Sequence, residues 1–353
     1  MNYKKRILVA PLNWGLGHAT RCIPIINALI DNGFEPILAS DGDALAILEK
    51  EFPKLTCLEL PSYGITYSKK ASHFKLKILW GSPKIIKAIK KENKVTARII
   101  EEYDVIGIIS DNRFGVRNKQ VASVFITHQL NVLSGNTSWL SSKLHQRSIS
   151  KFNECWVPDV KGTPNLSGDL GHLDHDSLFI KYIGPLSRFE KKELDIVYDL
   201  MILLSGPEPQ RTMVEDKILS ELEGFHGPVL FVRGKVEKNR TCSKNGKITI
   251  YNFMTASDLE IAINQSDILL CRSGYTMIMD LSKLGKKAFF IPTPGQYEQE
   301  YLANRLKESE IAPFSRQQEF SLEKLKEVEY YSGFSAIKNT IDLGDLFALF
   351  ERK

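Results

Sequence analysis

The chain has 353 residues, of which 43% are hydrophobic and 25% charged, the composition of an ordinary water-soluble globular protein. This length is too great for one typical domain and suits two. The net charge of +5 is only mildly basic and does not indicate a nucleic-acid partner. Five scattered cysteines without a CxxC pair predict reduced thiols in the cytoplasm. The N-terminal segment lacks the pattern of a signal peptide, and no apolar run of about 18 residues predicts a membrane-spanning helix.

The first half of the chain alternates short apolar runs with amphipathic stretches. RILVAPL, from Arg6, predicts a strand, and TRCIPIINALIDNG predicts a helix closed by Gly33. A second helix is expected in DALAILEKEF, and further strands are expected in EPILAS, LTCLELP, VIGIISD and VASVFIT. Near-continuous Ile, Val and Leu runs joined by helices indicate parallel strands covered on both faces.

The second half repeats this rhythm after a predicted linker, KYIGPLSRFEKKELD at residues 181–195. Strands are expected in YDLMILLSG, PVLFVRG, KITIYNF, DILLCRSG and KAFFIPT. We therefore predict an α/β protein with two doubly wound, Rossmann-like domains, 1–183 and 184–353, facing an interdomain cleft. Whether the last helix packs back on the N-terminal domain is left open. Ligands of such sheets bind beyond the carboxyl ends of the strands.

The segment LLCRSGYTMIMDLSKLG, Leu269 to Gly285, predicts a strand, a tight turn and a helix beginning near Tyr275 or Thr276. Backbone N–H groups and the helix dipole at such a turn form an anion site. Asp280, further along the helix, offers a carboxylate for a ribose diol. A Pro-Gly turn then presents polar side chains, namely Gln296, Glu298, Gln299 and Asn304. Together these features predict a nucleotide-sugar site, and the alternative is two ordinary strand-to-helix turns.

The segment CRSGYTMIMDLSKLGKKAFFIPTPGQYEQEYLANRL resembles the donor-binding segment of the MurG-like family of GT-B glycosyltransferases, which is related to UDP-N-acetylglucosamine transferases. NWGLGHATR is similar to the N-terminal Gly-rich loop of this family, and LLSGPEPQRT falls where the family carries a second such loop. The resemblance implies the GT-B fold and transfer of a sugar from a nucleotide-sugar donor. The implied donor is UDP-linked, such as UDP-N-acetylglucosamine, and neither a metal ion nor another cofactor is implied.

By this resemblance, Asp280 falls where the family has a glutamate that bonds the ribose hydroxyls. Phe253 and Met254, after the strand KITIY, are placed to contact a uracil. The other expected donor contacts are Gly17, Ser205, Gly206, Arg211, Arg272, Ser273, Gly274, Tyr275, Thr276, Gln296, Glu298 and Gln299. In the second loop, Pro207 and Pro209 replace residues of the family and remove two N–H donors. Phosphate contacts there are expected from Ser205, Gln210 and Arg211.

His18 stands where the first helix should begin, and we interpret it as the general base that takes the proton of an acceptor hydroxyl. An imidazole with a pKa near 6.5 suits this role near pH 7. Gly15 and Gly17 let a substrate approach the backbone closely. Arg21, one turn on, is expected to hold an anionic group of acceptor or donor. The alternative for His18 is a residue that caps its own helix.

Two more strand ends supply polar residues to the predicted cleft. His128 and Asp111 are rival candidates for the base, and the expected acceptor contacts also include Asn112, Arg113 and Gln129. The acceptor is unknown, and a lipid-linked compound is one candidate. The run GDLGHLDHD contains His172, Asp174, His175 and Asp176. We interpret it as a polar loop, since its spacing lacks the helical or strand frame of a metal site.

The stretch 67–94 interleaves lysines with apolar residues, among them Phe74 and Trp80. A helix beginning near Pro83 would place isoleucines on one face, namely Ile85, Ile86, Ile89, Ile99 and Ile100. Its opposite face would carry Lys84, Lys87, Lys90, Lys91 and Lys94. Such a stretch predicts contact with an anionic membrane surface, which would make the protein peripheral on the inner face of the membrane. The alternative is a core helix with a solvated lysine face.

Two other functions remain open. Nucleotide-sugar hydrolases of the pseudaminic acid pathway share the fold and a similar Gly-His-x-x-Arg turn, here residues 17–21, with water in place of the acceptor. The long basic segment 65–100 favours a transferase over this class. A non-catalytic nucleotide-sugar-binding protein would keep the 272–304 site without needing His18.

Overall fold

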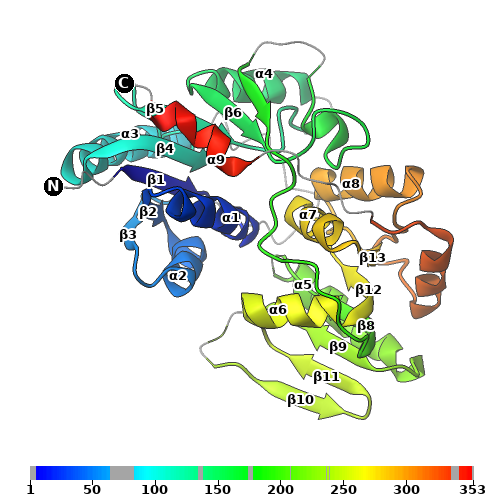
Figure 1. Cartoon of the computed structure of the whole chain (residues 1–353). Helices are drawn as coiled ribbons and strands as arrows, with labels where there is room; N and C mark the ends of the chain where they lie inside the picture. The colour runs from blue at the N-terminus through cyan, green and yellow to red at the C-terminus, as the bar shows by residue number, and fades with distance from the viewer. Residues whose placement is uncertain are drawn as a thin grey trace. The chain divides into compact units, whose positions relative to one another are not determined.

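The computed structural model describes residues 5–63, 83–133, 138–173, 178–206, 208–235, 237, 239–334 and 342–351. The chain forms two compact α/β units (Figure 1). The first unit contains the described residues up to Leu186 together with 342–351, and the second contains 187–334. The boundary between Leu186 and Ser187 falls inside the predicted linker.

In the described residues the first unit has a seven-stranded sheet of order β3-β2-β1-β4-β5-β6-β7, and all its pairs are parallel. Its strands are β1 Arg6–Pro11, β2 Glu35–Ser40, β3 Thr56–Glu59, β4 Val105–Asp111, β5 Ala122–Ile126, β6 Glu154–Val157 and β7 Ile180–Tyr182. The sequence analysis does not predict β6 and β7, which are only four and three residues long. The chain reverses its winding between β1 and β4, so the loops after these two strands meet at one edge.

The helices of the first unit cover both faces of this sheet. Ile89 of α3 packs against a cluster that contains Ile149 of α4, so these two helices share a face. On the other face the chain end packs beside α1, and Phe350 lies where a Cβ on Gly107 of β4 would stand (Figure 1). The helices are α1 Gly17–Asp31, α2 Gly42–Glu51, α3 Pro83–Tyr103, α4 Ser138–Ile149 and α9 Leu343–Leu346, with 3-10 turns Gly168–Leu170 and Phe347–Phe350.

The second unit has, in its described residues, a six-stranded sheet of order β10-β11-β9-β8-β12-β13. Its strands are β8 Tyr198–Leu203, β9 Val229–Val232, β10 Cys242–Asn245, β11 Ile248–Tyr251, β12 Ser266–Cys271 and β13 Lys287–Phe290. The β10–β11 pair is antiparallel and the others are parallel. The sequence analysis does not predict β10, because its four residues are polar and exposed. The carboxyl ends of β8, β12 and β13 therefore lie side by side.

The helices of the second unit are α5 Gln210–Glu221, α6 Ala256–Asn264, α7 Tyr275–Leu284 and α8 Tyr297–Glu308, with 3-10 turns Leu222–Gly224 and Leu322–Tyr330. Their core is apolar and includes Ile202, Phe231 and Phe289. Thr255 caps the N-terminus of α6, because its hydroxyl accepts the Asp258 N–H. Gly285 ends α7 at a φ of 65°, in the left-handed region that favours glycine.

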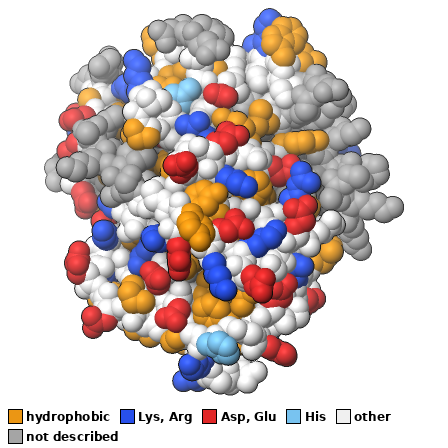
Figure 2. Space-filling model, turned by 90° about the vertical axis from the view of Figure 1, so that its right-hand side faces the viewer, with side chains coloured by type: hydrophobic (Ala, Val, Ile, Leu, Met, Phe, Trp, Pro, Cys, Tyr) orange, Lys and Arg blue, Asp and Glu red, His pale blue; other side chains and the backbone are white. Residues whose placement is uncertain are grey.

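The described helices include none with the length and apolarity needed to cross a membrane. On the face drawn in Figure 2, basic and acidic side chains are interspersed around a run of hydrophobic ones. The net charge of +5 is therefore not gathered into a single basic field on that face.

Candidate functional site

A cluster of polar side chains lies at the carboxyl edge of the first sheet. His18 and Arg21 stand in the first turns of α1, Asp111 ends β4, and His128 follows β5. Because β1, β4 and β5 are neighbours in the sheet, these positions meet in space. Asp111, Arg21 and His128 are buried, while the His18 side chain keeps 16% of its surface exposed. These residues are in contact with one another, as their positions at neighbouring strand ends predicted.

Asp111 is the hub of this cluster. Its Oδ1 lies 2.8 Å from His18 Nδ1 and also accepts a hydrogen bond from Arg21 Nη2. Its Oδ2 accepts from Arg21 Nε at 2.5 Å and, at 3.7 Å, from the Cys22 thiol. The Asn112 amide donates to Oδ1 at 3.2 Å. Since a carboxylate only accepts, the contact with His18 places the proton of that neutral imidazole on Nδ1 and leaves the lone pair on Nε2.

Burial and the surrounding charges set the protonation of this cluster. Burial lowers the pKa of His18, the Asp111 charge opposes this effect, and the Arg21 charge adds to it, so the pKa lies below 6.5. Burial alone would raise the pKa of Asp111, but the charges and hydrogen bonds of Arg21 and His18 hold it well below its usual range. At neutral pH the pair is therefore a carboxylate beside a neutral imidazole with an available lone pair.

Arg21, predicted to hold an anionic group of acceptor or donor, is bound by other residues of the protein. Its side chain is 1% exposed, and its guanidinium is committed to Asp111 and to His128, whose Nδ1 lies 2.9 Å from Arg21 Nη1. Asp111 lies 90 positions further along the chain, and nothing near Arg21 in the sequence marks this partner.

Arg113, predicted as an acceptor contact, is likewise bound by other residues of the protein. Arg113 is fully buried and donates to Glu92 at 2.6 Å, to Asp41 at 2.7 Å and to the carbonyl of Pro61. Tyr63 donates its hydroxyl to the same Glu92 at 2.5 Å. This network was not predicted from the sequence. The one feature that could have indicated it is Glu92, an acidic residue on the buried isoleucine face of α3.

In the second unit, an open turn lies at the carboxyl edge of the sheet. Gly274 precedes α7, has ordinary extended dihedral angles, and a Cβ built on it would meet no atom within 4 Å. Gly206, after β8, has a φ of 107°, and a Cβ there would lie 3.7 Å from the Thr293 hydroxyl. That hydroxyl is buried and has no hydrogen-bond partner among the described residues. A helix N-terminus facing open space is suited to an anion, and the unpaired Thr293 hydroxyl beside Gly206 is a further polar group at this edge of the sheet.

Several side chains predicted to contact the donor instead hold this turn together. The Ser273 hydroxyl is buried and donates to the Gln299 carbonyl at 2.8 Å. The Gln299 amide accepts from the Thr293 N–H and donates to Gln296 Oε1, both at 2.8 Å. Tyr275 is buried in the core. These residues would therefore shape the turn, and the surface open to a ligand is mostly backbone.

Two arginines predicted to contact the donor are, like Arg21, bound by other residues of the protein. Arg211 is buried and donates to Glu208 and, at 2.6 Å, to Glu215. Arg272 donates to the Ile291 carbonyl at 2.9 Å and to Gln317 at 2.8 Å. Burial lowers the pKa of Arg272 to about 10, which still leaves it charged at neutral pH.

Asp280 is buried in α7 and is 6% exposed. It accepts a hydrogen bond of 2.6 Å from the hydroxyl of Ser187. Burial raises the pKa of Asp280 to about 7, against the smaller opposing effects of Ser187 and of the Arg188 charge. A ribose diol could reach this carboxyl only after displacing Ser187.

The remaining predicted residues have varied surroundings. Phe253, Met254 and Glu298 are half-buried, as are Gly17, Thr276 and Gln129, while Ser205, Gly15 and Asn304 are exposed. His172 lies within hydrogen-bond distance of the Gly168 and Val160 carbonyls, at 2.8 and 3.0 Å, as in a structural loop. Asp174, His175 and Asp176 lie outside the described residues, as do residues 67–82 of the basic stretch.

The helix predicted from Pro83 is confirmed as α3, and its five lysines are exposed. Ile86 departs from the prediction, because it is 46% exposed among these lysines.

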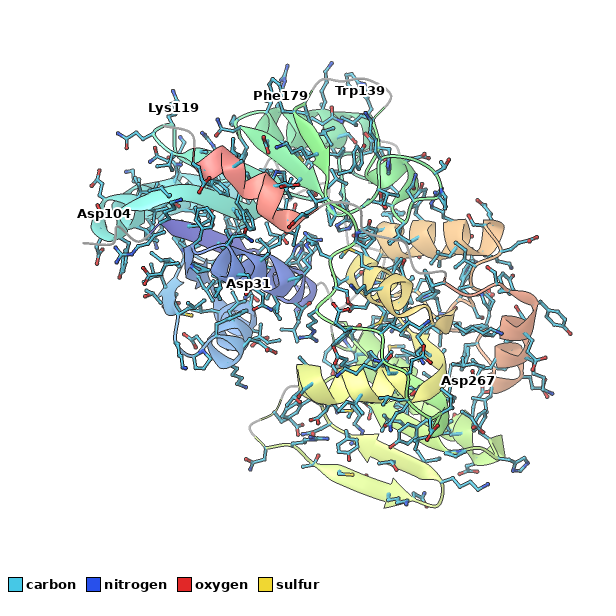
Figure 3. The ribbon with its side chains drawn as sticks, viewed as in Figure 1. Asp31, Asp104, Lys119, Trp139, Phe179 and Asp267 are labelled. Carbon is cyan, nitrogen blue, oxygen red and sulfur yellow. The ribbon has the colours of Figure 1, made fainter. Side chains whose placement is uncertain are left out.

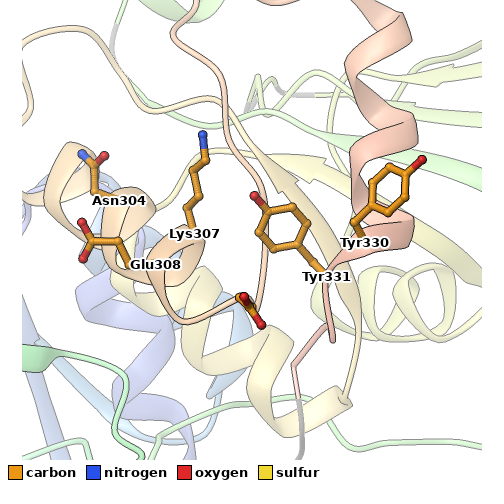
Figure 4. Close-up of a pocket in the computed structure, with 6 residues that line it drawn as sticks. Asn304, Lys307, Glu308, Tyr330 and Tyr331 are labelled. Carbon is orange, nitrogen blue, oxygen red and sulfur yellow. The ribbon is translucent and has the colours of Figure 1, made fainter.

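A surface hollow of about 560 Å³ lies elsewhere in the second unit (Figure 4). It is lined by the end of α8 and the residues after it, including Lys307, Glu308, Tyr330 and Tyr331. Asn304, one of the polar residues predicted for the nucleotide-sugar site, also lines the hollow. The other lining residues belong neither to the turn before α7 nor to the loop after β8, so the hollow is separate from the open turn at Gly274.

Residues 217–330 match the family model of the glycosyltransferase family 28 C-terminal domain. This match lies within the second unit and spans less than half of the chain. The matched family 28 domain includes β12, α7 and α8, and hence the open turn at Gly274. The loop containing Gly206 precedes the matched residues.

Curated relatives and solved structures agree with the family 28 domain. The UDP-N-acetylglucosamine–N-acetylmuramyl-(pentapeptide) pyrophosphoryl-undecaprenol N-acetylglucosamine transferase of Haemophilus ducreyi is 26% identical over 208 residues, 57% of this chain and 55% of the relative. The chain thus matches just over half the length of that relative. The resemblance to MurG-like transferases inferred from the motifs is confirmed.

Two solved structures share the fold. MurG of Acinetobacter baumannii has a TM-score of 0.57 at 12% identity, covering 94% of this chain and 93% of that one. The spinosyn rhamnosyltransferase SpnG complexed with thymidine diphosphate has a TM-score of 0.61 at 13% identity, covering 97% and 96%. The prediction of two Rossmann-like units of the GT-B class is confirmed.

Proposed function

We propose that the protein is a glycosyltransferase that moves a sugar from a nucleoside-diphosphate donor, UDP-linked as in UDP-N-acetylglucosamine, to a hydroxyl acceptor. The observation that carries the proposal is the pairing of His18 with Asp111, which leaves an imidazole lone pair on a partly exposed side chain. The family 28 domain and the transferase names of the curated relatives support the reaction class.

In this proposal His18 Nε2 takes the proton of the acceptor hydroxyl while that oxygen bonds to the anomeric carbon. The bond between the anomeric carbon and the donor oxygen breaks, and its electron pair leaves with the nucleoside diphosphate. Asp111 holds the imidazole in the required tautomer and stabilises the imidazolium that forms. Because Asp111 is buried and its pKa is depressed, we propose it as a positioning group and no longer as a rival base.

The leaving diphosphate would be held at the N-terminus of α7. The backbone N–H groups after Gly274 would face it, with the Thr293 hydroxyl as a further donor. This arrangement needs neither a metal ion nor an arginine from the turn. SpnG is a fold neighbour whose structure contains thymidine diphosphate, which supports a nucleoside diphosphate as the ligand class.

The acceptor would be lipid-linked and reached at an anionic membrane surface. Helix α4 has no acidic residue and exposes Trp139, Leu140 and Leu144 by 72%, 52% and 41%. Lys143 lies 4.7 Å from the Trp139 ring centre, and Figure 3 shows Trp139 projecting from the surface. Helix α3 packs on the same face of the sheet as α4, and its lysines are exposed. Exposed aromatic and basic side chains together favour the interface of a membrane.

A thermal-shift series with UDP, UDP-N-acetylglucosamine and uridine tests the donor site. A ligand at 100 times its Kd stabilises the folded state by about 2.7 kcal/mol. Gly274→Val is the matched variant, because its backbone angles accept valine and its side chain would enter open space. It should keep the melting temperature of the free protein and lose the shift with UDP. An unchanged shift would exclude the α7 turn as the site.

Transfer itself is tested by following labelled sugar from the donor into lipid extracts. His18→Ala should slow transfer by about 10²–10⁴-fold with little change in donor affinity. A normal rate in this variant would remove the proposed base. Rapid release of free sugar without any acceptor would instead identify a hydrolase.

A further inference from the structure

Arg21 contacts His18 and His128 as well as Asp111. Its Nη1 lies 2.9 Å from His128 Nδ1, and its Nη2 lies 2.9 Å from His18 Nδ1 and donates to Asp111. The side chain is 1% exposed, so its contacts are made away from water. A guanidinium remains charged in proteins and can only donate hydrogen bonds.

The contact with His128 has one consistent assignment. Since Arg21 only donates, Nδ1 of His128 must accept, and the proton of the neutral ring must be on Nε2. Arg21 therefore favours the His128 tautomer that carries its proton on Nε2, which makes Nε2 a donor.

The contact with His18 has the opposite outcome. His18 Nδ1 faces both Asp111 Oδ1 and Arg21 Nη2. If Nδ1 had no proton, its lone pair would lie 2.8 Å from the carboxylate oxygen and be repelled by it. With the proton on Nδ1, the shared oxygen of Asp111 accepts from both residues. His18 then presents a lone pair at Nε2, whereas His128 presents an N–H at the same position.

We infer that Arg21 is the positioning residue that assigns opposite tautomers to the two histidines, so that His18 is able to accept a proton and His128 is not. This assignment rests on the proposed function only where it concerns the rate of transfer. The tautomers themselves follow from the contacts and exist whether or not the protein transfers a sugar.

Arg21 also controls how readily His18 becomes charged. The charged and titratable groups that act on His18 are Asp111 from β4, Arg21 from its own helix and His128 after β5. Asp111 favours the imidazolium, and Arg21 and His128 oppose it. Arg21→Gln removes a positive charge next to the ring, so the pKa of His18 should rise.

The test is nitrogen NMR of the histidine side chains in the full-length protein, with ¹⁵N in the imidazoles and pH varied. In the wild type we expect a proton on Nδ1 of His18 and on Nε2 of His128. In Arg21→Gln the titration midpoint of His18 should move to higher pH, and His128 should become a mixture of the two neutral tautomers. Arg113→Lys is the control, because that arginine is equally buried against carboxylates and contacts neither histidine. It should leave both rings unchanged.

Two outcomes would overturn the inference: Nδ1–H on His128 in the wild type, or an unmoved His18 midpoint in Arg21→Gln. If that variant does not fold, Arg21→Lys replaces it. Lysine keeps the positive charge but lacks the planar set of donors of the guanidinium. His128 should therefore become a mixture of tautomers, while the titration midpoint of His18 stays near its wild-type value. The pH at which the transfer rate falls on the acid side of its pH profile should follow the titration midpoint of His18 in each variant. Correct tautomers without any transfer would refute the proposed function and leave the assignment of Arg21 intact.

Discussion

Replacing Asp280 by asparagine should make the protein more stable at alkaline pH and change little at acid pH. Burial raises the pKa of Asp280 from 3.8 to about 7. The unfolded chain therefore releases this proton near pH 4, and the folded chain releases it only near pH 7. The stabilising effect of the protonated group is complete below pH 4 and disappears as the pH rises to 7. About three pKa units at 1.36 kcal/mol each correspond to about 4 kcal/mol, which is an upper bound.

Urea unfolding of the wild type and of Asp280→Asn between pH 4.5 and 8 measures this difference. Asparagine has the same shape and can still accept the Ser187 hydrogen bond, so the two proteins should converge at pH 4.5 and separate toward pH 8. Asp267→Asn is the control, because Asp267 is an exposed aspartate of the same unit (Figure 3). A difference between wild type and Asp280→Asn that does not depend on pH would refute the reasoning.

Three further perturbations follow from the packing. Arg113→Ala leaves two carboxylates without their buried partner and should cost about 3–5 kcal/mol in chemical denaturation, whereas an effect below 1 kcal/mol would mean that the network is solvated. Trp139→Ala and Lys143→Glu should each reduce co-sedimentation with vesicles of anionic lipid at low salt, and unchanged binding would remove α4 from the membrane surface. Gly107→Ala should lower the melting temperature through a clash with Phe350, and the added substitution Phe350→Ala should relieve that clash.

Much of the fold could be predicted because its strands are buried and apolar. β2 and β4 lie where EPILAS and VIGIISD predict them. β6 and β10 were missed for a physical reason: four residues contain too little pattern, and β10 is polar on both faces. Their existence depends on neighbouring strands with unpaired N–H and C=O groups, which local sequence does not reveal.

The site was predictable in its positions and less so in its roles. The position of His18 at the start of the first helix and that of Asp111 at a strand end indicated a common edge, since parallel strands end together. The sequence could not distinguish an arginine that binds a ligand from one that binds a distant carboxylate. Arg21 finds its partner 90 positions away, and the sequence near it contains no acid that would mark it.

The arginines near the carboxyl edges of the two sheets share a physical explanation. A guanidinium offers five donors in a plane, so one side chain can tie several loops that would otherwise have unpaired acceptors. Arg272 bonds carbonyls after β13 and at the start of α5, and Arg113 joins β2 to α3. In the proposed donor site, an anion at the second sheet would therefore be held mainly by fixed backbone dipoles. Such dipoles are placed before the ligand arrives and need no reorganisation when charge develops on a departing diphosphate. The buried Arg272, which fixes the loops, and the open turn at Gly274, which would bind the anion through its backbone, thus have complementary roles in the proposed site.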